Sequence, residues 1–271
     1  MSLVRLCLLL ALGLGLQAQD KATSPVATKP VPRTELKAQI APGATLRFDF
    51  PELTVDRRGA LAACHLKLPA AYDAAKNYPL VVWLGGGEGG NQPSGAFLPA
   101  GDFILVGLPY PKGANKPKQA NMVGDYVQVW AYHRFMLEEI AKVIPHIDKS
   151  RSVIAGFSNG AHAIDGMLRL RDRPGLTDHF NVFLFADGGG TGYTSLGALP
   201  DLNGRFAYVC WGSEKGSNKH DTSHLPAALR AAGATVVGSE MTGVGHAFAA
   251  SEYPKIAEWL AKVALASPAK K

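Results

Sequence analysis

The sequence predicts an α/β fold in which helices cover both faces of a mostly parallel sheet. Short apolar runs alternate with longer segments whose apolar residues recur at helical spacing. Strands and helices that alternate in this way form parallel sheets, because each connection must cross a face of the sheet. Hydrophobic residues make up 47% of the 271 positions, enough for one large domain with a substantial core.

The first residues, MSLVRLCLLLALGLGLQAQD, have the pattern of a signal peptide. Arg5 supplies the positive start, and residues 6–16 supply the apolar centre. This run is shorter than the roughly 20 apolar residues that span a bilayer. We therefore expect residues 1–19 to be cleaved on export. The mature chain would be secreted or periplasmic, without stable membrane insertion.

Residues 20–45 are rich in Pro, Ala, Thr and Lys, which predicts a flexible linker before a folded domain at 46–271. In that domain, strands are expected at the apolar runs 46–50, 61–68, 79–84, 103–108, 151–155, 182–186, 206–211 and 235–237. The run PLVVWL at 79–84 is apolar throughout, as a strand buried on both faces must be. A loop rich in Pro, Gly and Lys follows the fourth run.

Four helices are expected, at 127–144, 159–171, 225–232 and 253–266. The first carries apolar residues at helical spacing, with Glu138 and Glu139 on the solvent side. The third is followed by Gly233, a common helix terminator, and the last has an amphipathic pattern. Ligands of parallel α/β sheets bind beyond the carboxyl ends of the strands, so the functional site is expected there.

The segment GFSNG at 156–160 matches G-x-S-x-G, the pattern of a nucleophile elbow. It lies between a predicted buried strand and a predicted helix, as the motif requires. Glycines flank Ser158 because the turn is too sharp for side chains there, and the serine hydroxyl is exposed above the sheet. The backbone N–H of Asn159 is then placed to stabilise an oxyanion.

A serine hydroxyl needs a base, and His246 is the candidate. It lies in a glycine-rich loop between the last strand and the last helix, after the serine in the chain. His162 is four residues past Ser158 on the predicted helix and is expected to point away from the elbow. The other histidines fall in helices or polar loops.

The sequence leaves two candidates for the acid that orients the imidazole. Glu214 follows the strand at 206–211 and is favoured over Asp221 in the same loop, which is placed to cap the following helix. Asp187, which ends the strand at 182–186, is the alternative. The second oxyanion donor is expected at Gly86 or Gly87, where bare glycines let backbone N–H groups approach a ligand oxygen.

The same glycine-rich stretch, residues 85–90, formally matches the dinucleotide pattern G-x-G-x-x-G. No helical pattern follows it, and Asp102 comes too early to bind a ribose, so we reject a nucleotide site. The formal charge of +6 is scattered along the chain, which argues against nucleic-acid binding. The sequence has no H-E-x-x-H and too few cysteines for a zinc site, so neither metal nor cofactor is expected. Cys64 and Cys210 are expected to be buried free thiols.

These residues resemble the α/β-hydrolase superfamily, and within it the secreted esterases of feruloyl-esterase, polyhydroxybutyrate-depolymerase and esterase-D type. The resemblance spans roughly residues 60–262 and rests on LPAAYD at 68–73, YPLVVWL at 78–84, the elbow, the His246 loop and EWL at 258–260. Members commonly begin the oxyanion loop with His-Gly, where this chain has Gly85-Gly86. They also commonly have an aspartate where this chain has Lys215.

We therefore expect an exported serine hydrolase that cleaves carboxylic esters through Ser158, His246 and an acid. No inserted segment is long enough for a large lid, which suits a small-molecule or polymer-linked ester. The resemblance adds esterified plant polysaccharide as a substrate class. The alternative is a catalytically impaired homologue that binds a carbohydrate or a protein. It is motivated by the absent loop histidine and the absent aspartate.

Overall fold

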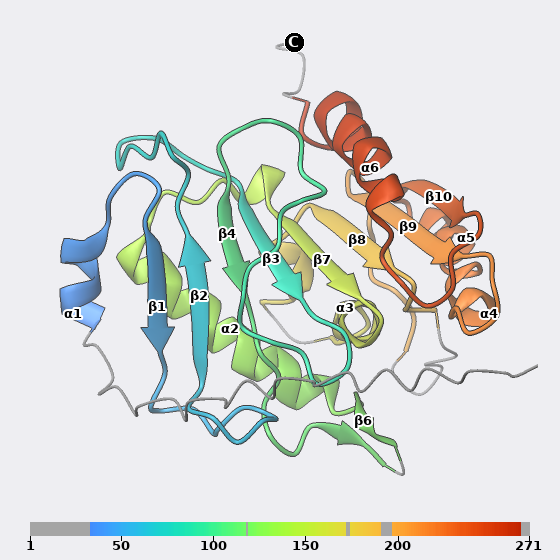
Figure 1. The fold of residues 1–271 in the computed structure, drawn as a ribbon, viewed down its shortest axis with the longest axis horizontal. Coiled ribbons are helices and arrows are strands. Elements are labelled where there is room, and N and C mark those ends of the chain that lie inside the picture. Colours follow the sequence, from blue (N-terminus) through green and yellow to red (C-terminus); the bar gives the residue numbers. More distant parts are fainter. Residues whose placement is uncertain (1–32, 118, 172–173, 191–196, 267–271) are drawn as a thin grey trace, which may run out of the picture.

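The computed structural model describes residues 33–117, 119–171, 174–190 and 197–266. Its centre is an eight-stranded sheet in the order β1-β2-β4-β3-β7-β8-β9-β10 (Figure 1). The strands are β1 (Thr45–Asp49), β2 (Ala63–Lys67), β3 (Leu80–Leu84), β4 (Ile104–Gly107), β7 (Val153–Phe157), β8 (Val182–Ala186), β9 (Phe206–Gly212) and β10 (Thr235–Met241). Strand β2 is antiparallel to β1 and β4, and all other neighbours are parallel. The predicted mostly parallel sheet is confirmed.

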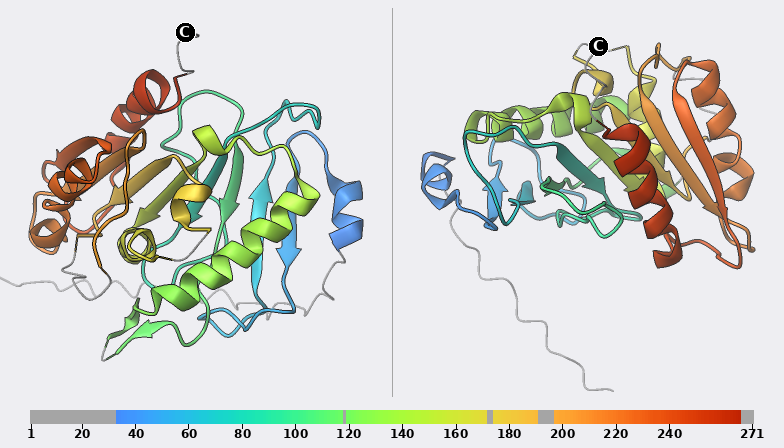
Figure 2. Two further views of the ribbon diagram at one scale, coloured as in Figure 1. Left: turned by 180° about the vertical axis from the view of Figure 1, so that it is seen from behind. Right: turned by 90° about the horizontal axis from the view of Figure 1, so that it is seen from above.

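Helices cover both faces of the sheet, as predicted (Figure 2). One face packs against α2 (Tyr126–Val143), α3 (Asn159–Leu168) and α5 (Leu225–Ala231). The other face packs against α6 (Tyr253–Trp259), which continues as a π turn at Leu260–Ala264. The connection from β3 to β4 contains no helix, and Phe97 packs there on the α6 face. No segment forms a large lid over the described part of the molecule.

Each of the eight predicted strands is present, and β10 runs further than expected, to Met241. The sequence analysis missed two short helices, α1 (Arg33–Leu36) and α4 (Lys219–Thr222). It also missed the hairpin of β5 (Asn115–Lys116) and β6 (Gln119–Val123), which projects from the lower edge of the view in Figure 1. These strands are short and polar, so they lack the apolar runs on which the prediction depended.

The prediction of a flexible linker at 20–45 extends too far toward the C-terminus. Residues 33–45 include α1 and the 3-10 helix at Lys37–Gln39, and they lead directly into β1. Leu36 is 1% exposed and belongs to the main core, so its burial holds this segment against the domain. The predicted signal peptide and the start of the linker lie outside the described residues.

The two cysteines outside the predicted signal peptide are free thiols. Cys64 is buried in β2 and Cys210 in β9, as the sequence analysis expected. Burial in apolar surroundings raises the pKa of both thiols, so they behave as small hydrophobic side chains. Among the described helices, none combines the length and apolar character needed to cross a membrane.

Candidate active site

Ser158 occupies the sharp bend between β7 and α3. Its backbone has φ 52° and ψ −114°, a conformation that costs free energy for a residue with a side chain. A Cβ at position 156 would lie 2.4 Å from the carbonyl carbon of Gly160, and one at position 160 would lie 2.1 Å from the Leu84 oxygen. Both flanking glycines are therefore required by close packing. The Ser158 N–H donates to the Ala186 oxygen at 2.8 Å, which fixes the bend against β8.

A chain of hydrogen bonds joins Ser158, His246 and Asp187. The Ser158 Oγ lies 2.8 Å from His246 Nε2, and His246 Nδ1 lies 2.6 Å from Asp187 Oδ2. An ionised carboxylate can only accept a hydrogen bond. The His246 Nδ1 therefore carries a proton and donates a hydrogen bond to Asp187. Nε2 is then left with a lone pair that accepts from the serine hydroxyl. This is the geometry of a nucleophile, a base and an orienting acid.

Asp187 is fully buried, and several donors surround its carboxylate. Oδ1 accepts from the Gly212 N–H at 3.2 Å, the Asn218 N–H at 3.2 Å and the Ser217 hydroxyl at 3.0 Å. The Asn218 side chain also donates to the Asp187 main-chain oxygen at 2.7 Å. A buried carboxylate needs such partners to stay charged, and here they also fix its direction toward His246.

The sequence analysis favoured Glu214 as the acid, and the structure contradicts that preference. The Glu214 side chain is exposed and pairs with the Ser213 hydroxyl at 3.1 Å. The loop after β9 does not bring a carboxylate to His246. It directs Ser217 and Asn218 onto Asp187. Asp187, the alternative acid of the sequence analysis, takes the position on the imidazole.

The predicted oxyanion donors lie next to Ser158. Asn159 is the first residue of α3, so its N–H has no acceptor within the helix. Gly86 is in direct contact with the elbow, since a Cβ there would lie 3.2 Å from the Ser158 Cβ. Gly87 is tied to this group through its carbonyl oxygen, which accepts from the Asn159 side chain at 2.6 Å. The Asn159 Oδ1 in turn accepts from the Val123 N–H at 3.0 Å.

The glycine-rich loop has Gly85 where members of the resembled family commonly have a histidine. In the structure the Tyr110 hydroxyl donates to the Gly85 oxygen at 2.8 Å. Burial raises the pKa of this phenol, so it remains protonated and available as a donor. No local pattern could have revealed Tyr110, since it approaches the loop only after β4 is paired with β3.

Two arginines hold the outer side of the same loop. Arg57 donates to the Gly87 oxygen at 3.3 Å and to the Ala120 oxygen at 2.6 Å, which connects the loop to the β5–β6 hairpin. The Arg58 guanidinium donates to the Gly89 oxygen. These donors lie some thirty positions before the loop in the sequence, so their contacts also depend on the tertiary fold.

The candidate site opens directly onto the surface. The His246 side chain is 39% exposed, although Ser158 and Asp187 are buried. The Phe157 ring, which is half-buried, lies 5.1 Å from the His246 ring between their centroids. It also contacts Gly86, so an apolar surface borders Ser158 and His246 on one side.

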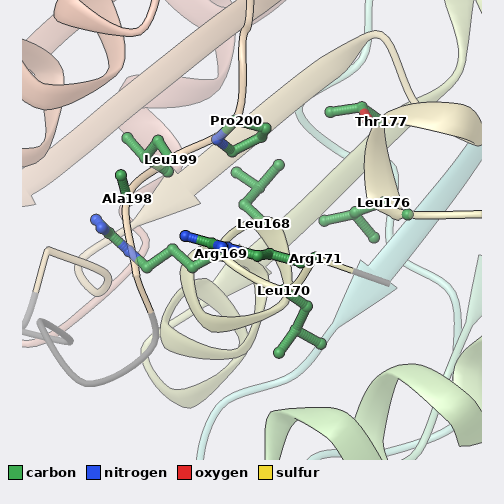
Figure 3. A pocket seen from close by; sticks show the side chains of 10 residues that line it. Leu168, Arg169, Leu170, Arg171, Leu176, Thr177, Ala198, Leu199 and Pro200 are labelled. Atoms are coloured by element: carbon green, nitrogen blue, oxygen red, sulfur yellow. The ribbon is translucent and has the colours of Figure 1, made fainter. Parts of the chain in front are cut away.

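The pocket shown in Figure 3 is separate from these residues. It has a volume of about 240 Å³ and lies at the carboxyl end of α3, away from Ser158. Arg169 and Arg171 line it together with Leu168 at the end of α3, Leu170 and Leu176 beyond it, and residues 198–200. None of Ser158, Asp187 and His246 contributes to its lining.

No family model and no curated protein matches the sequence. Solved structures do match. A carboxylesterase from Bacillus cereus has a TM-score of 0.52 at 15% identity, over 85% of this chain and 98% of its own. The chain has the α/β-hydrolase fold.

Two further solved structures share this α/β-hydrolase fold. A phospholipase/carboxylesterase from Dyadobacter fermentans has a TM-score of 0.51 at 16% identity, over 70% of this chain and 92% of its own. The acylaminoacyl peptidase of Pyrococcus horikoshii has a TM-score of 0.58 at 11% identity, over 88% of this chain and 44% of its own. Proteins with this α/β-hydrolase fold thus include both esterases and a peptidase, so the fold alone does not select the reaction.

Proposed function

We propose that the protein is a serine hydrolase that cleaves carboxylic esters. The observation that carries this proposal is the hydrogen-bonded series Ser158–His246–Asp187, which begins at a strained elbow. The alternative of an impaired binding protein was motivated in part by Lys215, which stands where an aspartate is common. Asp187 supplies a carboxylate to His246 instead. Tyr110 supplies a donor to the oxyanion loop where the usual histidine is missing.

In the proposed reaction Ser158 Oγ attacks the ester carbonyl while His246 Nε2 takes the hydroxyl proton. The negative charge that develops on the carbonyl oxygen is stabilised by the N–H groups of Asn159 and of Gly86 or Gly87. His246 then gives its proton to the leaving alcohol, and an acyl-enzyme remains. Water, activated by the same imidazole, releases the acid and restores Ser158.

The exposure of His246 supports an ester carried by a bulky or polymeric molecule, of which esterified plant polysaccharide is one. The segment at 1–19 supports export to the periplasm or the medium. Mass spectrometry of the chain recovered outside the cytoplasm tests this second point. We expect a mature protein that lacks the first 19 residues, and an intact N-terminus would contradict it.

The test of the activity is hydrolysis of p-nitrophenyl acetate together with labelling by a fluorophosphonate probe. We expect turnover and labelling of the wild-type chain, and loss of both in Ser158→Ala. The matched p-nitroanilide separates an esterase from a peptidase. Well-folded protein that neither labels nor turns over would refute the proposal and favour a binding role.

A further inference from the structure

Helix α3 carries two buried polar side chains that the proposed reaction does not use. His162 is one turn beyond Ser158 and only 3% exposed, and Asp165 is fully buried. Burying polar groups costs free energy unless each finds a partner. For both residues these partners include the backbone turn that directly follows Asp187.

The turn at residues 188–190 lies against α3. The Gly189 N–H donates to His162 Nδ1 at 2.9 Å, and the Gly190 N–H donates to Asp165 Oδ2 at 3.0 Å. A Cβ at position 188 would lie 2.3 Å from the Ser158 oxygen, so the turn also contacts the elbow itself. The helix that begins at the nucleophile therefore holds the residues next to the acid.

His162 is in the protonation state that this arrangement needs. Burial lowers its pKa to about 4, so the ring is neutral near pH 7 and its Nδ1 lone pair can accept. Asp165 is fixed from the other side by Arg169, whose Nε lies 3.0 Å from Oδ1. Arg169, which lines the pocket in Figure 3, also donates to the Gly197 oxygen at 3.3 Å.

Asp187 itself needs this support. Its φ is 43°, a conformation that a residue with a side chain adopts only when its surroundings hold it there. The donors described above, from Gly212, Ser217 and Asn218, hold the carboxylate. The main chain beyond Asp187 is bonded to α3 through the Gly189 and Gly190 N–H groups, in addition to the bond of the Asn218 side chain to the Asp187 main-chain oxygen.

We propose that His162 and Asp165 are positioning residues that anchor the turn after Asp187 and so aim its carboxylate at His246. The effect on catalysis rests on the proposed function, whereas the effect on the Asp187–His246 hydrogen bond does not. Because Ser158 is the N-cap of the same helix, the anchor also keeps nucleophile and acid at a fixed separation.

Three substitutions of His162 test the role of its Nδ1 as the acceptor for the Gly189 N–H. Asparagine places a carbonyl oxygen near the site of Nδ1, glutamine moves it toward the site of Nε2, and leucine removes it. The measurements are kcat and KM for p-nitrophenyl butyrate and the far-downfield proton resonance of His246 Nδ1–H. His179→Leu is the matched control, because burial also lowers the pKa of His179 to about 4 but its ring packs on Trp130.

We expect His162→Asn to keep the resonance, with kcat within about threefold of wild type. His162→Leu and His162→Gln should lose or shift the resonance and lower kcat by about tenfold or more at little-changed KM, because a small misplacement of a catalytic group is costly. If the leucine variant does not fold, the comparison of Asn with Gln decides.

A folded His162→Leu or His162→Gln with the wild-type resonance and kcat would overturn the inference. So would equal losses in the Asn and Gln variants, which would assign the effect to packing rather than to the acceptor. If the wild-type chain hydrolyses no ester, the proposed function fails, and the resonance alone still tests the anchor.

Discussion

At the scale of single residues, the candidate site depends on a carboxylate that water does not reach. Asp187 is fully buried, so its charge is stabilised by hydrogen-bond donors and by His246. During the proposed attack His246 becomes positively charged, and the fixed negative charge at 2.6 Å stabilises it. Solvent would screen the charge of an exposed carboxylate and weaken this stabilisation.

Asp187→Asn tests this role directly. The amide cannot hold the imidazole in the correct tautomer, so kcat should fall by about 10⁴ in ester hydrolysis. Glu214→Gln is the control, and because Glu214 is exposed we expect kcat within about twofold of wild type. The assignment of the acid is wrong if the two variants exchange these results.

Ser158 and His246, which the structure brings within hydrogen-bond distance, could both be predicted because each carries a local signal. The serine stands in a glycine-flanked turn between a strand and a helix, and the histidine follows the last strand in a glycine-rich loop. Asp187 and Glu214 each follow the end of a strand, and the sequence does not distinguish them. Only the packed loop after β9, which directs Ser217 and Asn218 onto Asp187, decides between them.

At the scale of elements, the glycine-rich loop after β3 is held by side chains from other parts of the chain. The Tyr110 hydroxyl donates to the Gly85 oxygen. Asn159 and Arg57 donate to the Gly87 oxygen, and Arg58 donates to the Gly89 oxygen. A loop of bare glycines would otherwise pay a large entropic cost to keep its N–H groups aimed at one oxygen. These side chains thus hold in one conformation a loop whose own glycine-rich sequence would leave it flexible.

Tyr110→Phe removes one of these donors without changing the ring. We expect kcat to fall by about tenfold, less than the 10²–10³ that follows removal of an oxyanion donor itself. Tyr132→Phe is the matched control, because its buried hydroxyl bonds the Thr54 oxygen and does not contact the loop. Equal kcat values in Tyr110→Phe and wild type would show that the loop does not depend on this donor.

At the scale of the whole molecule, alternating apolar runs and helical spacings were enough to predict the sheet and the layers. The central strands β3, β7 and β8 are buried along nearly their whole length and therefore apolar, which is what the sequence shows. The hairpin at β5 and β6 was not predictable, because its polar strands are placed by contacts with Arg57 and Asn159. Likewise, one buried side chain, Leu36, orders a segment whose composition suggests a linker.

Stability of the whole domain should fall as the pH is lowered from about 6.5 toward 4. Burial lowers the pKa of His133, His162 and His179 to about 4 from an ordinary value of 6.5. Between these values the unfolded chain binds more protons than the folded chain, so acid favours unfolding.

Urea denaturation at several pH values measures this dependence. The 1%-exposed His133 should contribute about 1.4 kcal/mol per pH unit at most within that window. His133→Phe should therefore show a shallower loss of unfolding free energy than wild type, whatever its stability at pH 7. Identical slopes would show that His133 titrates normally in the folded protein.

The neighbouring strands β7 and β8 pair Phe157 with Ala186, and the residues that follow this pair are Ser158 and Asp187. The proposed nucleophile and the proposed acid are thus adjacent across one ladder. The stretch from Glu214 to Gly216 lies beside the His246 loop, with the Glu214 N–H on the Val244 oxygen, yet it supplies no reacting group. Glu214 and Lys215 are exposed there and could be varied to change the surface beside His246, whereas Gly216 has φ 93° and would be strained by any side chain.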